Sequence, residues 1–259
     1  MKPVMSNMLT FTLALLCLSG CSVKEDRSVC PCRLILDFSD VDISSIGSVD
    51  LSVTTQDGFE YADEVDSDVF ANDYMVSVPR RLVLVTGWAG TDGCLSEDGV
   101  LIPYGSDSPP VYLHLSSVDA DCEEVNERIV MHKNYCHMTI NMKGEETDSP
   151  VLILSSNVNG YEKDGRPSQG DFRYEVSPDE DRAACLDLPR QVDDSMILEI
   201  DDGTGVVKRF PLGEYVAESG YDWTAPDLDD ITIDLDLAVT HVSLTIQGWE
   251  TEHKFDVVI

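Results

Sequence analysis

The amino-acid sequence predicts an all-β protein made of two β-sandwich domains in tandem. Apolar and polar residues alternate with a period of two in short segments throughout the chain, as at Leu34, Leu36 and Phe38. Turn residues separate these segments at short intervals, and one stretch, residues 212–219, has the pattern of a short helix. Short strands at regular spacing, few helices and two halves of similar length are typical of tandem sandwiches.

The expected strands follow one another along the chain with few interruptions. Residues 59–73 are acidic and weakly patterned, so they predict a surface loop or a short helix. Asn159-Gly160 and residues 201–203 are typical of hairpin turns. The expected strands are residues 34–38, 49–53, 74–78, 82–85, 100–104, 111–115, 138–142, 151–154, 172–176, 184–188, 196–200, 206–210, 231–237, 242–246 and 255–259.

Residues 143–150 mark the expected domain boundary. The segment is polar, with a glycine near its start and a proline at its end, and it separates two sets of strands of similar extent. We therefore expect an N-terminal β-sandwich domain at residues 33–146 and a C-terminal β-sandwich domain at residues 147–259.

The N-terminus has the pattern of a signal peptide. Residues 8–18 form a mostly apolar run of eleven residues behind one basic residue, and small residues follow it. At 1.5 Å of rise per residue, a helix of this length covers roughly 16 Å of a hydrocarbon core about 30 Å thick, which is too short to span a membrane.

The four residues that end at Cys21, Leu-Ser-Gly-Cys, resemble the bacterial lipobox, in which the cysteine is acylated and becomes the new N-terminus. We therefore expect cleavage between Gly20 and Cys21, a lipoprotein signal peptide at residues 1–20 and a lipid-anchored tether at residues 21–32. Cys21 would carry a diacylglycerol and an N-acyl lipid, and no other cofactor is expected. Two or three acyl chains, at about 0.8 kcal/mol per buried CH₂, hold a protein firmly on a membrane.

A small charged cluster follows the expected lipidation site. Residues 22–26, Ser-Val-Lys-Glu-Asp, resemble the acidic export signal of surface-exposed lipoproteins in Bacteroidetes-type bacteria. The alternative is an ordinary polar tether. We expect a lipid-anchored protein of the cell outer membrane that is exposed on the cell surface.

The charge of the chain narrows the range of partners. The formal net charge is −32 at pH 7, because 49 acidic residues outnumber 17 basic ones. Such a surface repels nucleic acid and anionic membranes, so neither is expected to bind by electrostatic attraction. The 42% of apolar residues, arranged in strand patterns, are sufficient for a sizeable core.

The cysteines after Cys21 are even in number, which favours disulfide bonds in an exported protein. These six candidates are Cys30, Cys32, Cys94, Cys122, Cys136 and Cys185. Six cysteines allow fifteen pairings, and the sequence does not choose among them. The Cys-Pro-Cys segment is too short to close on itself without strain, so each of its sulfurs is expected to pair with a different later segment.

A zinc site is the alternative use of one of these cysteines. Cys136 lies close in the sequence to His132 and His137, and this spacing suits zinc. There is no Cys-x-x-Cys pair to complete a tetrahedral ligand set, so we expect no bound metal.

No sequence motif of enzymatic chemistry is present. Residues 203–205 lack the spacing of a phosphate-binding loop, and there is no Gly-x-Ser-x-Gly turn. The acidic clusters at residues 119–121 and 227–230 lack the calcium-loop pattern and are expected to be solvated. His114 lies in an apolar strand, which favours a packed side chain over a catalytic base. We expect no enzyme activity and no small-molecule substrate. The tryptophans, expected to pack partly into the core, are Trp88, Trp223 and Trp249.

Several segments resemble the FimB-type (Mfa-like) fimbrial anchor lipoproteins of Bacteroidetes. They span nearly the whole chain: Glu-Asp-Arg-Ser-x-Cys-Pro-Cys before Leu-x-Leu-Asp within residues 21–41, Met-His-Lys-Asn-Tyr-Cys at 131–136, Asn-Val-Asn-Gly at 157–160, Tyr-Asp-Trp at 221–223, Asp-Asp-Ile-Thr-Ile at 229–233 and Gly-Trp-Glu at 248–250. The resemblance implies two transthyretin-like β-sandwich domains and a role as the anchor subunit of a fimbrium, or pilus.

The resemblance also implies a fimbrial shaft subunit as the partner, held by strand exchange. This mode needs a terminal strand with alternating apolar side chains, and Phe255, Val257 and Ile259 form a candidate donor strand. The alternative is that this strand folds back into its own domain.

Two other functions stay open at this point. A surface glycan-binding lipoprotein of a nutrient-uptake system would use the same lipid anchor and sandwiches, and it would need exposed aromatic side chains. A tip adhesin of the same fimbriae would lose its N-terminal strand and its lipid by proteolysis, for which Arg27 and Arg33 are the candidate cleavage points.

Overall fold

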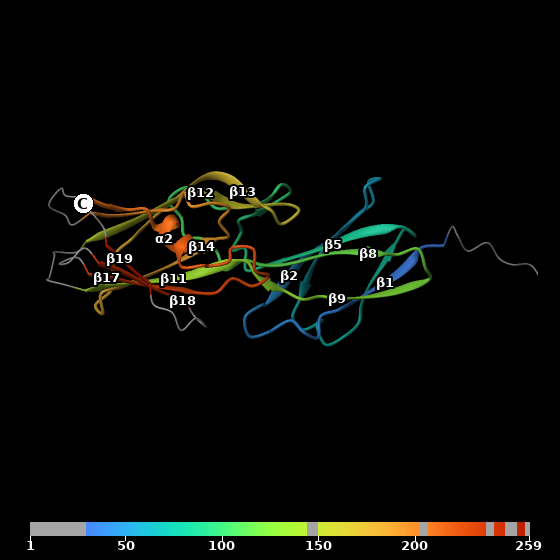
Figure 1. The fold of residues 1–259 in the computed structure, drawn as a ribbon. Coiled ribbons are helices and arrows are strands. Elements are labelled where there is room, and N and C mark those ends of the chain that lie inside the picture. The colour runs from blue at the N-terminus through green and yellow to red at the C-terminus, as the bar shows by residue number, and fades with distance from the viewer. Residues whose placement is uncertain (1–29, 144–149, 202–206, 237–240, 247–252, 257–259) are drawn as a thin grey trace, which may run out of the picture.

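The computed structural model describes residues 30–143, 150–201, 207–236, 241–246 and 253–256, and nearly all of its regular elements are β-strands. The described part of the molecule is elongated, with sheets gathered into two bodies along the long axis (Figure 1). Each body has its own large cluster of buried apolar side chains. The all-β fold class is therefore confirmed. None of the helices in these residues is long and apolar enough to cross a membrane.

The first body consists of two sheets that enclose one core. Its strands are β1 (Cys32–Asp37), β2 (Ser48–Thr54), β3 (Glu60–Asp66), β4 (Tyr74–Val78), β5 (Leu82–Ala89), β8 (Tyr112–Asp119), β9 (Glu124–Arg128) and β10 (His132–Lys133). The sheet orders are β4-β1-β9 and β10-β8-β5-β2-β3. Leu34 of β1, Leu51 of β2 and Val85 of β5 are buried in the shared core, as the alternating patterns of β1 and β2 predict.

The second body is built in the same way, with one helix against its core. Its elements are β6 (Leu95–Ser96), β7 (Gly99–Leu101), β11 (Tyr135–Lys143), β12 (Val151–Glu162), β13 (Pro167–Val176), β14 (Ala183–Pro189), β15 (Ile197–Asp201), β16 (Val207–Phe210), α2 (Leu212–Glu218), β17 (Ile231–Asp236), β18 (His241–Ile246) and β19 (His253–Asp256). The sheet orders are β14-β11-β17-β18-β19 and β16-β15-β12-β7-β6, and β13 pairs with β12. The predicted helix is confirmed, and it buries Leu212 and Val216 in the core.

Four strands were not expected from the sequence: β3, β9 and the two-residue strands β6 and β10. Residues 59–73 were expected to be a loop or a helix, but β3 lies within them and pairs with β2 at the edge of the sheet. Its sequence, Glu-Tyr-Ala-Asp-Glu-Val-Asp, buries Val65 alone, so the apolar alternation that identifies a strand is missing. Strand β9 is similar, because four of its five residues are polar and it lies at the edge beside β1.

The hairpin turn expected at Asn159-Gly160 is wrong, because β12 continues through these residues to Glu162. The reversal comes at residues 163–166, where the Glu162 N–H donates to the Arg166 carbonyl at 2.8 Å. Gly160 has a φ of +143°, and a Cβ built on it would lie 2.0 Å from the Val100 carbonyl oxygen. The glycine therefore permits the close pairing of β7 with β12 rather than a turn. The other expected turn, 201–203, falls mostly outside the described residues.

The structure assigns β11 to the second body, although the expected domain 33–146 includes it in the first. Strand β11 pairs with β14 and β17, and Met138 and Ile140 are buried in the second core. Strand β12 belongs to the same body, so the polar segment 143–150 joins two strands around one core. A polar composition suits both a long loop within a domain and a linker between domains. Only the strand pairing distinguishes these two possibilities.

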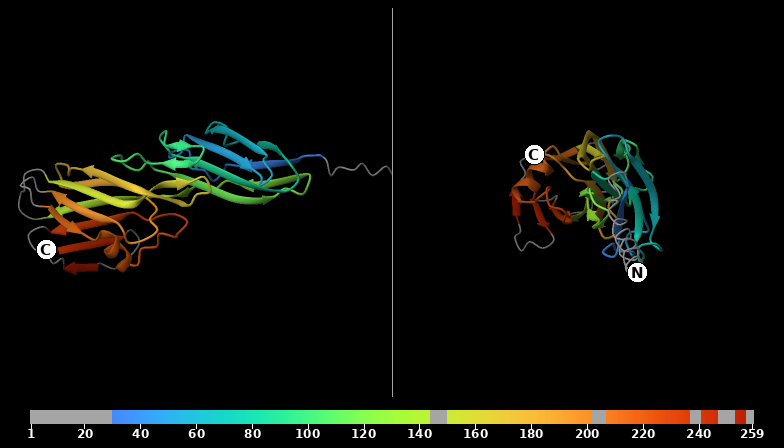
Figure 2. Two further views of the ribbon diagram at one scale, coloured as in Figure 1. Left: turned by 90° about the horizontal axis from the view of Figure 1, so that it is seen from above. Right: turned by 90° about the vertical axis from the view of Figure 1, so that its right-hand side faces the viewer.

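A small aromatic cluster joins the two bodies. Trp88 of β5 packs against Tyr161 of β12, with ring centroids 6.0 Å apart. The buried Tyr161 hydroxyl donates to the Asn134 carbonyl and accepts the Arg190 N–H, the latter at 2.8 Å. Because β12 begins in the second body and ends beside β7 near the first, the two bodies are connected by packed strands (Figure 2).

Candidate functional site

Strand β1 is the element through which the expected lipid tether joins the folded protein. It lies between β4, with which it is antiparallel, and β9, with which it is parallel. Leu34 and Leu36 are fully buried, so both the backbone and one face of β1 are integral to the first body. Cys21 and Gly20, the expected acylation and cleavage positions, lie outside the described residues.

The backbone at Arg33 is hydrogen-bonded on the side of β9. Its N–H donates to the Glu123 carbonyl at 3.0 Å, and its exposed guanidinium forms an ion pair with Glu124. On the other side, Arg33 lies opposite Ser77 of β4. A protease must extend a segment of chain in its active site, so cleavage at Arg33 requires β1 to leave the sheet. Arg27, the other candidate cleavage point, lies outside the described residues.

The structure brings together two of the candidate cysteines that are far apart in the sequence. The sulfur atoms of Cys32 and Cys122 are 3.8 Å apart at the end of β1. The six cysteines among the described residues are present as thiols, so the expected disulfides stay predictions. Of the remaining four, Cys136 is buried and Cys94 partly so, whereas Cys30 and Cys185 are exposed.

The side chains considered for a zinc site have separate partners. His132 Nδ1 lies 3.1 Å from an Asp227 carboxylate oxygen, and His137 Nδ1 lies 2.7 Å from Asp187 Oδ1. Cys136 points into the second core, where burial raises the pKa of its thiol to about 12 and disfavours the thiolate that zinc requires. No group of three ligating side chains occurs in the part of the chain that the structure describes.

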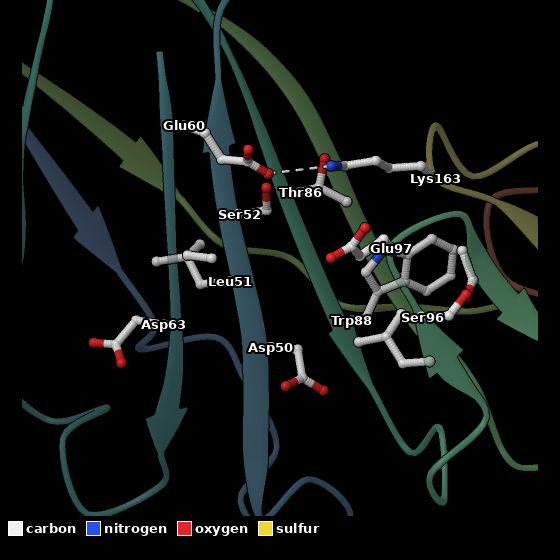
Figure 3. Close-up of a pocket in the computed structure, with 13 residues that line it drawn as sticks. Asp50, Leu51, Ser52, Glu60, Asp63, Thr86, Trp88, Ser96, Glu97 and Lys163 are labelled. Atoms are coloured by element: carbon white, nitrogen blue, oxygen red, sulfur yellow. Dashed lines mark hydrogen bonds and ion pairs between the residues drawn. The ribbon is translucent and has the colours of Figure 1, made fainter. Parts of the chain in front are cut away.

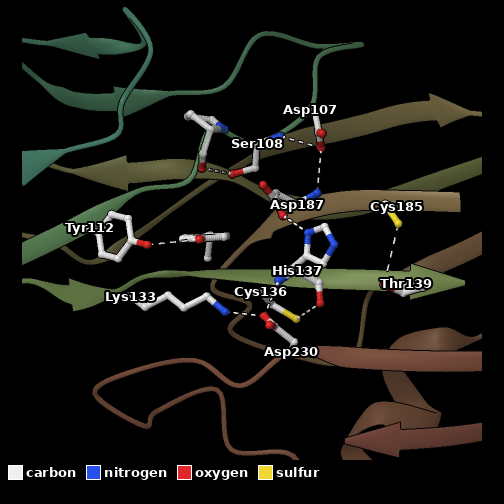
Figure 4. Close-up of polar contacts among 12 residues, drawn as sticks. Asp107, Ser108, Tyr112, Lys133, Cys136, His137, Thr139, Cys185, Asp187 and Asp230 are labelled. Atoms are coloured by element: carbon white, nitrogen blue, oxygen red, sulfur yellow. Dashed lines mark hydrogen bonds and ion pairs between the residues drawn. The ribbon is translucent and has the colours of Figure 1, made fainter. Parts of the chain in front are cut away.

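His137 belongs to a network of polar contacts that holds loops against β11 and β14 (Figure 4). The Asp107 carboxylate accepts the backbone N–H of Asp187 at 3.0 Å, and burial raises the pKa of Asp107 to about 6. The Asp230 carboxylate accepts the His137 backbone N–H at 3.1 Å and forms an ion pair with Lys133. The Asp107 and Asp230 contacts each join a loop to a strand, and the His137–Asp187 contact joins β11 to β14.

A cleft lies on the outer face of the first body, beneath β6 and the β12–β13 turn (Figure 3). It has a volume of about 490 Å³, and Asp50, Glu97 and Trp88 are among its lining residues. Lys163 reaches across it to Glu60, with 3.3 Å between Nζ and Oε1. Burial and the neighbouring Glu64 raise the pKa of Asp50.

The two tryptophans among the described residues, Trp88 and Trp223, offer little exposed surface for a sugar ring. Trp88 is only 4% exposed, as expected for a packed tryptophan, although it lines the cleft. Trp223 is half-buried and packs edge-on against Tyr221, with ring centroids 4.6 Å apart. Trp249 lies outside the described residues. His114, expected to be packed, is 5% exposed, and burial lowers its pKa.

The C-terminal strand is paired within its own chain. Strand β19 lies at the edge of its sheet and is antiparallel to β18, with Phe255 opposite Val242. Val257 and Ile259, the other two candidate donor residues, lie outside the described residues. Strands β1 and β19 lie towards opposite ends of the long axis (Figure 1).

Comparisons with known proteins support the fold. No family model and no curated protein matches the chain. The fimbrial anchor protein Mfa2 from Porphyromonas gingivalis matches with a TM-score of 0.60 and 14% identity, over 85% of this chain and 98% of that one. A proposed polysaccharide-binding protein from Bacteroides thetaiotaomicron matches with a TM-score of 0.66 and 13% identity, over 86% and 98%. A proposed adhesin from Bacteroides ovatus matches with a TM-score of 0.57 and 14% identity, over 90% and 97%.

These matches cover nearly all of each solved structure, so the chain shares their whole fold and not a part of it. The Mfa-like fold that the sequence resemblance implies is therefore confirmed. At identities of 13 to 14%, the likeness extends to the fold alone.

Proposed function

We propose that this protein is a lipid-anchored outer-membrane subunit that anchors a fimbrium to the cell surface. The observation that carries the proposal is the position of β1, which follows the tether at residues 21–32 directly and is paired with β4 and β9. A force on a fimbrium held by Cys21 would therefore pass into a strand hydrogen-bonded on two sides. The shared fold with the anchor protein Mfa2 supports the same role.

The tip adhesin is less favoured because its maturation would remove this strand. Loss of β1 would expose the apolar side chains of the first core, including the neighbours of Leu34 and Leu36, both fully buried. It would also leave β4 and β9 without the strand that joins them. A strand kept in place preserves both the core and the connection to the lipid.

The surface glycan-binding lipoprotein is the second candidate. The proposed polysaccharide-binding protein that shares the fold favours it, as does the cleft beside Trp88. The buried state of Trp88 counts against it, because sugar rings stack on exposed aromatic faces. We therefore place it below the anchor.

The C-terminal segment is proposed to contact the adjoining shaft subunit by strand exchange. The position of β19 towards the end of the molecule opposite β1 suits a subunit that is held at one end and binds at the other (Figure 1). Donation of this strand would require the pairing of β19 with β18 to open, which involves four residue pairs. An edge strand can open in this way without disturbing the other strands of its sheet.

The anchor proposal is tested by deleting the gene in its source strain and measuring fimbrial protein on washed cells and in the medium. We expect fimbriae to be shed into the medium and to be longer than normal. Fimbriae unchanged in place and in length would contradict the anchor role. In that case, saccharide affinity of the purified protein would identify the glycan-binding alternative.

The donor segment is tested by co-purification with shaft subunits. Phe255, Val257 and Ile259 alternate in the sequence, so Val258 falls on the opposite face of an extended strand. We expect Val257→Asp to reduce capture of shaft subunits at least tenfold, because it places a charge among apolar neighbours. Val258→Asp is the matched control and should bind normally. Equal capture by both variants would contradict strand exchange through this face.

A further inference from the structure

Cys32 and Cys122 lie side by side, although they are 90 residues apart in the sequence. Their sulfur atoms are 3.8 Å apart, and a disulfide bond needs about 2.05 Å. Cys32 is the first residue of β1, and Cys122 lies two residues before β9. The two thiols therefore stand at the end of the β1 and β9 pair where the chain from the tether reaches the fold.

The parallel pairing of β1 with β9 produces this proximity. Arg33 is opposite Glu124, and the Arg33 N–H donates to the Glu123 carbonyl at 3.0 Å. Cys32 and Cys122 thus precede a fixed backbone contact by one residue each. The sulfur atoms must approach each other by about 1.8 Å more to reach the length of a disulfide bond. Rotation of the two side chains can achieve this, because the backbone positions are already set.

The two thiols differ in accessibility but face the same core. Cys32 is fully buried in the first core, and Cys122 packs against that core while remaining partly exposed. A disulfide between them would replace two polar thiols by an apolar group inside an apolar cluster. The bond would cost one contact, because the Cys122 thiol now donates to the Glu124 carbonyl at 3.2 Å.

The geometry points to a structural disulfide bond between Cys32 and Cys122 that fixes β1 in its sheet. The bond forms by exchange with the disulfide of an oxidised dithiol donor. The Cys122 thiolate attacks the donor and forms a mixed disulfide, and the Cys32 thiolate then attacks the Cys122 sulfur. The donor leaves as a dithiol, having gained two electrons and the two protons that the cysteines lost.

The order in which the two thiols react follows from how deeply each is buried. Cys122 is the thiol that a donor can reach in the folded protein. Burial raises the pKa of Cys32 to about 11, so its attack on the mixed disulfide is slow once β1 is in place. The bond therefore forms most readily during folding, before Cys32 is enclosed.

The consequence is that β1 is held covalently at the residue where the tether ends. Strand β1 could no longer be withdrawn from between β4 and β9, either by a force on the N-terminus or by a competing strand. Cross-links that close long loops stabilise the folded state most, because they restrict the unfolded chain. This conclusion depends on the geometry alone and is independent of the anchor role.

Cys30 is the competitor that the experiment must separate from Cys32. It is exposed, two residues away, and it lines the same pocket as Glu123 and Glu124. Trypsin leaves Cys30 and Cys32 on one peptide, residues 28–33, so the test includes the variant Cys30→Ser.

The pairing is tested on full-length protein isolated from its own cells, with free thiols blocked by iodoacetamide at lysis. Digestion with trypsin and Asp-N without reduction should give residues 28–33 linked to residues 121–128, a species that disappears on reduction. The link should persist in Cys30→Ser and be absent from Cys32→Ser. Alkylation of Cys122 by iodoacetamide in the wild type would show that its thiol was free and would overturn the proposal. Loss of the link in Cys30→Ser would overturn it as well.

The effect on β1 is tested by thermal unfolding with and without reductant. Reduction should lower the Tm of the wild type by roughly 10 °C, the value that a loop of this length implies. Cys32→Ser should show no such drop, because it has no bond to reduce. Cys185→Ser, which removes an exposed thiol of β14, is the matched control and should keep the full drop. An unchanged wild-type Tm would refute the claim that the bond holds β1.

Discussion

The hydroxyl of Tyr161 is the residue-scale feature on which the junction between the bodies depends. It donates to the Asn134 carbonyl and accepts the Arg190 N–H at 2.8 Å, and the side chain is 2% exposed. We expect Tyr161→Phe to lower the free energy of unfolding by about 1–3 kcal/mol, because two buried backbone groups lose their partner. Urea denaturation measures this loss. Tyr104→Phe, at a side chain 68% exposed, is the control and should change little; equal effects would contradict the role of the hydroxyl.

The half-buried carboxyl of Asp107 makes stability depend on pH. Its pKa is raised to about 6 from 3.8, so between these values the folded protein holds a proton that the unfolded chain has lost. The free energy of unfolding therefore falls as the pH rises through this window. The loss is complete above pH 6, and there is no loss below pH 3.8. Asp107 Oδ1 accepts the Ser108 and Asp187 N–H groups, both at 3.0 Å, and an asparagine oxygen can accept both.

Asp107→Asn should therefore raise the free energy of unfolding near neutral pH by about 1 kcal/mol, a value reduced because the carboxyl is only partly buried. The gain should disappear towards pH 4, as urea denaturation at the two pH values would show. Asp68→Asn removes the same charge from the exposed surface and controls for the large net charge. A gain that is the same at both pH values, or the same in the control, would contradict the explanation.

At the scale of elements, the sequence predicts a strand where one of its faces is buried and the other is not. Strand β2 buries alternate residues and was expected, whereas β3 beside it buries Val65 alone and was missed. An edge strand forms through backbone hydrogen bonds to its one neighbour. Its side chains therefore need not show the apolar alternation that predicts a strand. The same limit explains the incorrect prediction of a turn at Asn159-Gly160, because glycine suits both a turn and a close strand contact.

Gly160 gives the element-scale prediction. An added Cβ would meet the Val100 carbonyl oxygen at 2.0 Å, and the φ of +143° disfavours any other residue. Gly160→Ala should cost about 2 kcal/mol of unfolding free energy and speed hydrogen exchange in β7. Gly47→Ala is the matched control, because no atom lies within 4 Å of its Cβ position. Slow exchange in β7 of the Gly160 variant would show that the contact is not required.

At the scale of the whole molecule, the contacts that matter join residues distant in the sequence. The alternation of β1 predicts a strand, but its parallel pairing with β9 and its position beside β4 depend on the complete topology. For the same reason, the sequence leaves fifteen pairings for six cysteines, and the fold brings Cys32 to Cys122. The sequence thus predicts that the cysteine at the start of β1 forms a disulfide bond, but it does not predict which cysteine is its partner.

The last prediction concerns the connection of the molecule to the membrane. Cys21→Ser removes the thiol that the lipid needs, so we expect no incorporation of a palmitate analogue and release of the protein from washed membranes. Cys17→Ser, four residues upstream within the expected signal peptide, is the matched control and should stay acylated. If the lipid carries the load of a fimbrium, Cys21→Ser cells should shed fimbriae as the deletion strain does. Fimbriae retained on cells whose Cys21→Ser protein has left the membrane would mean that the load reaches the membrane through another protein, and the anchor proposal would then be wrong.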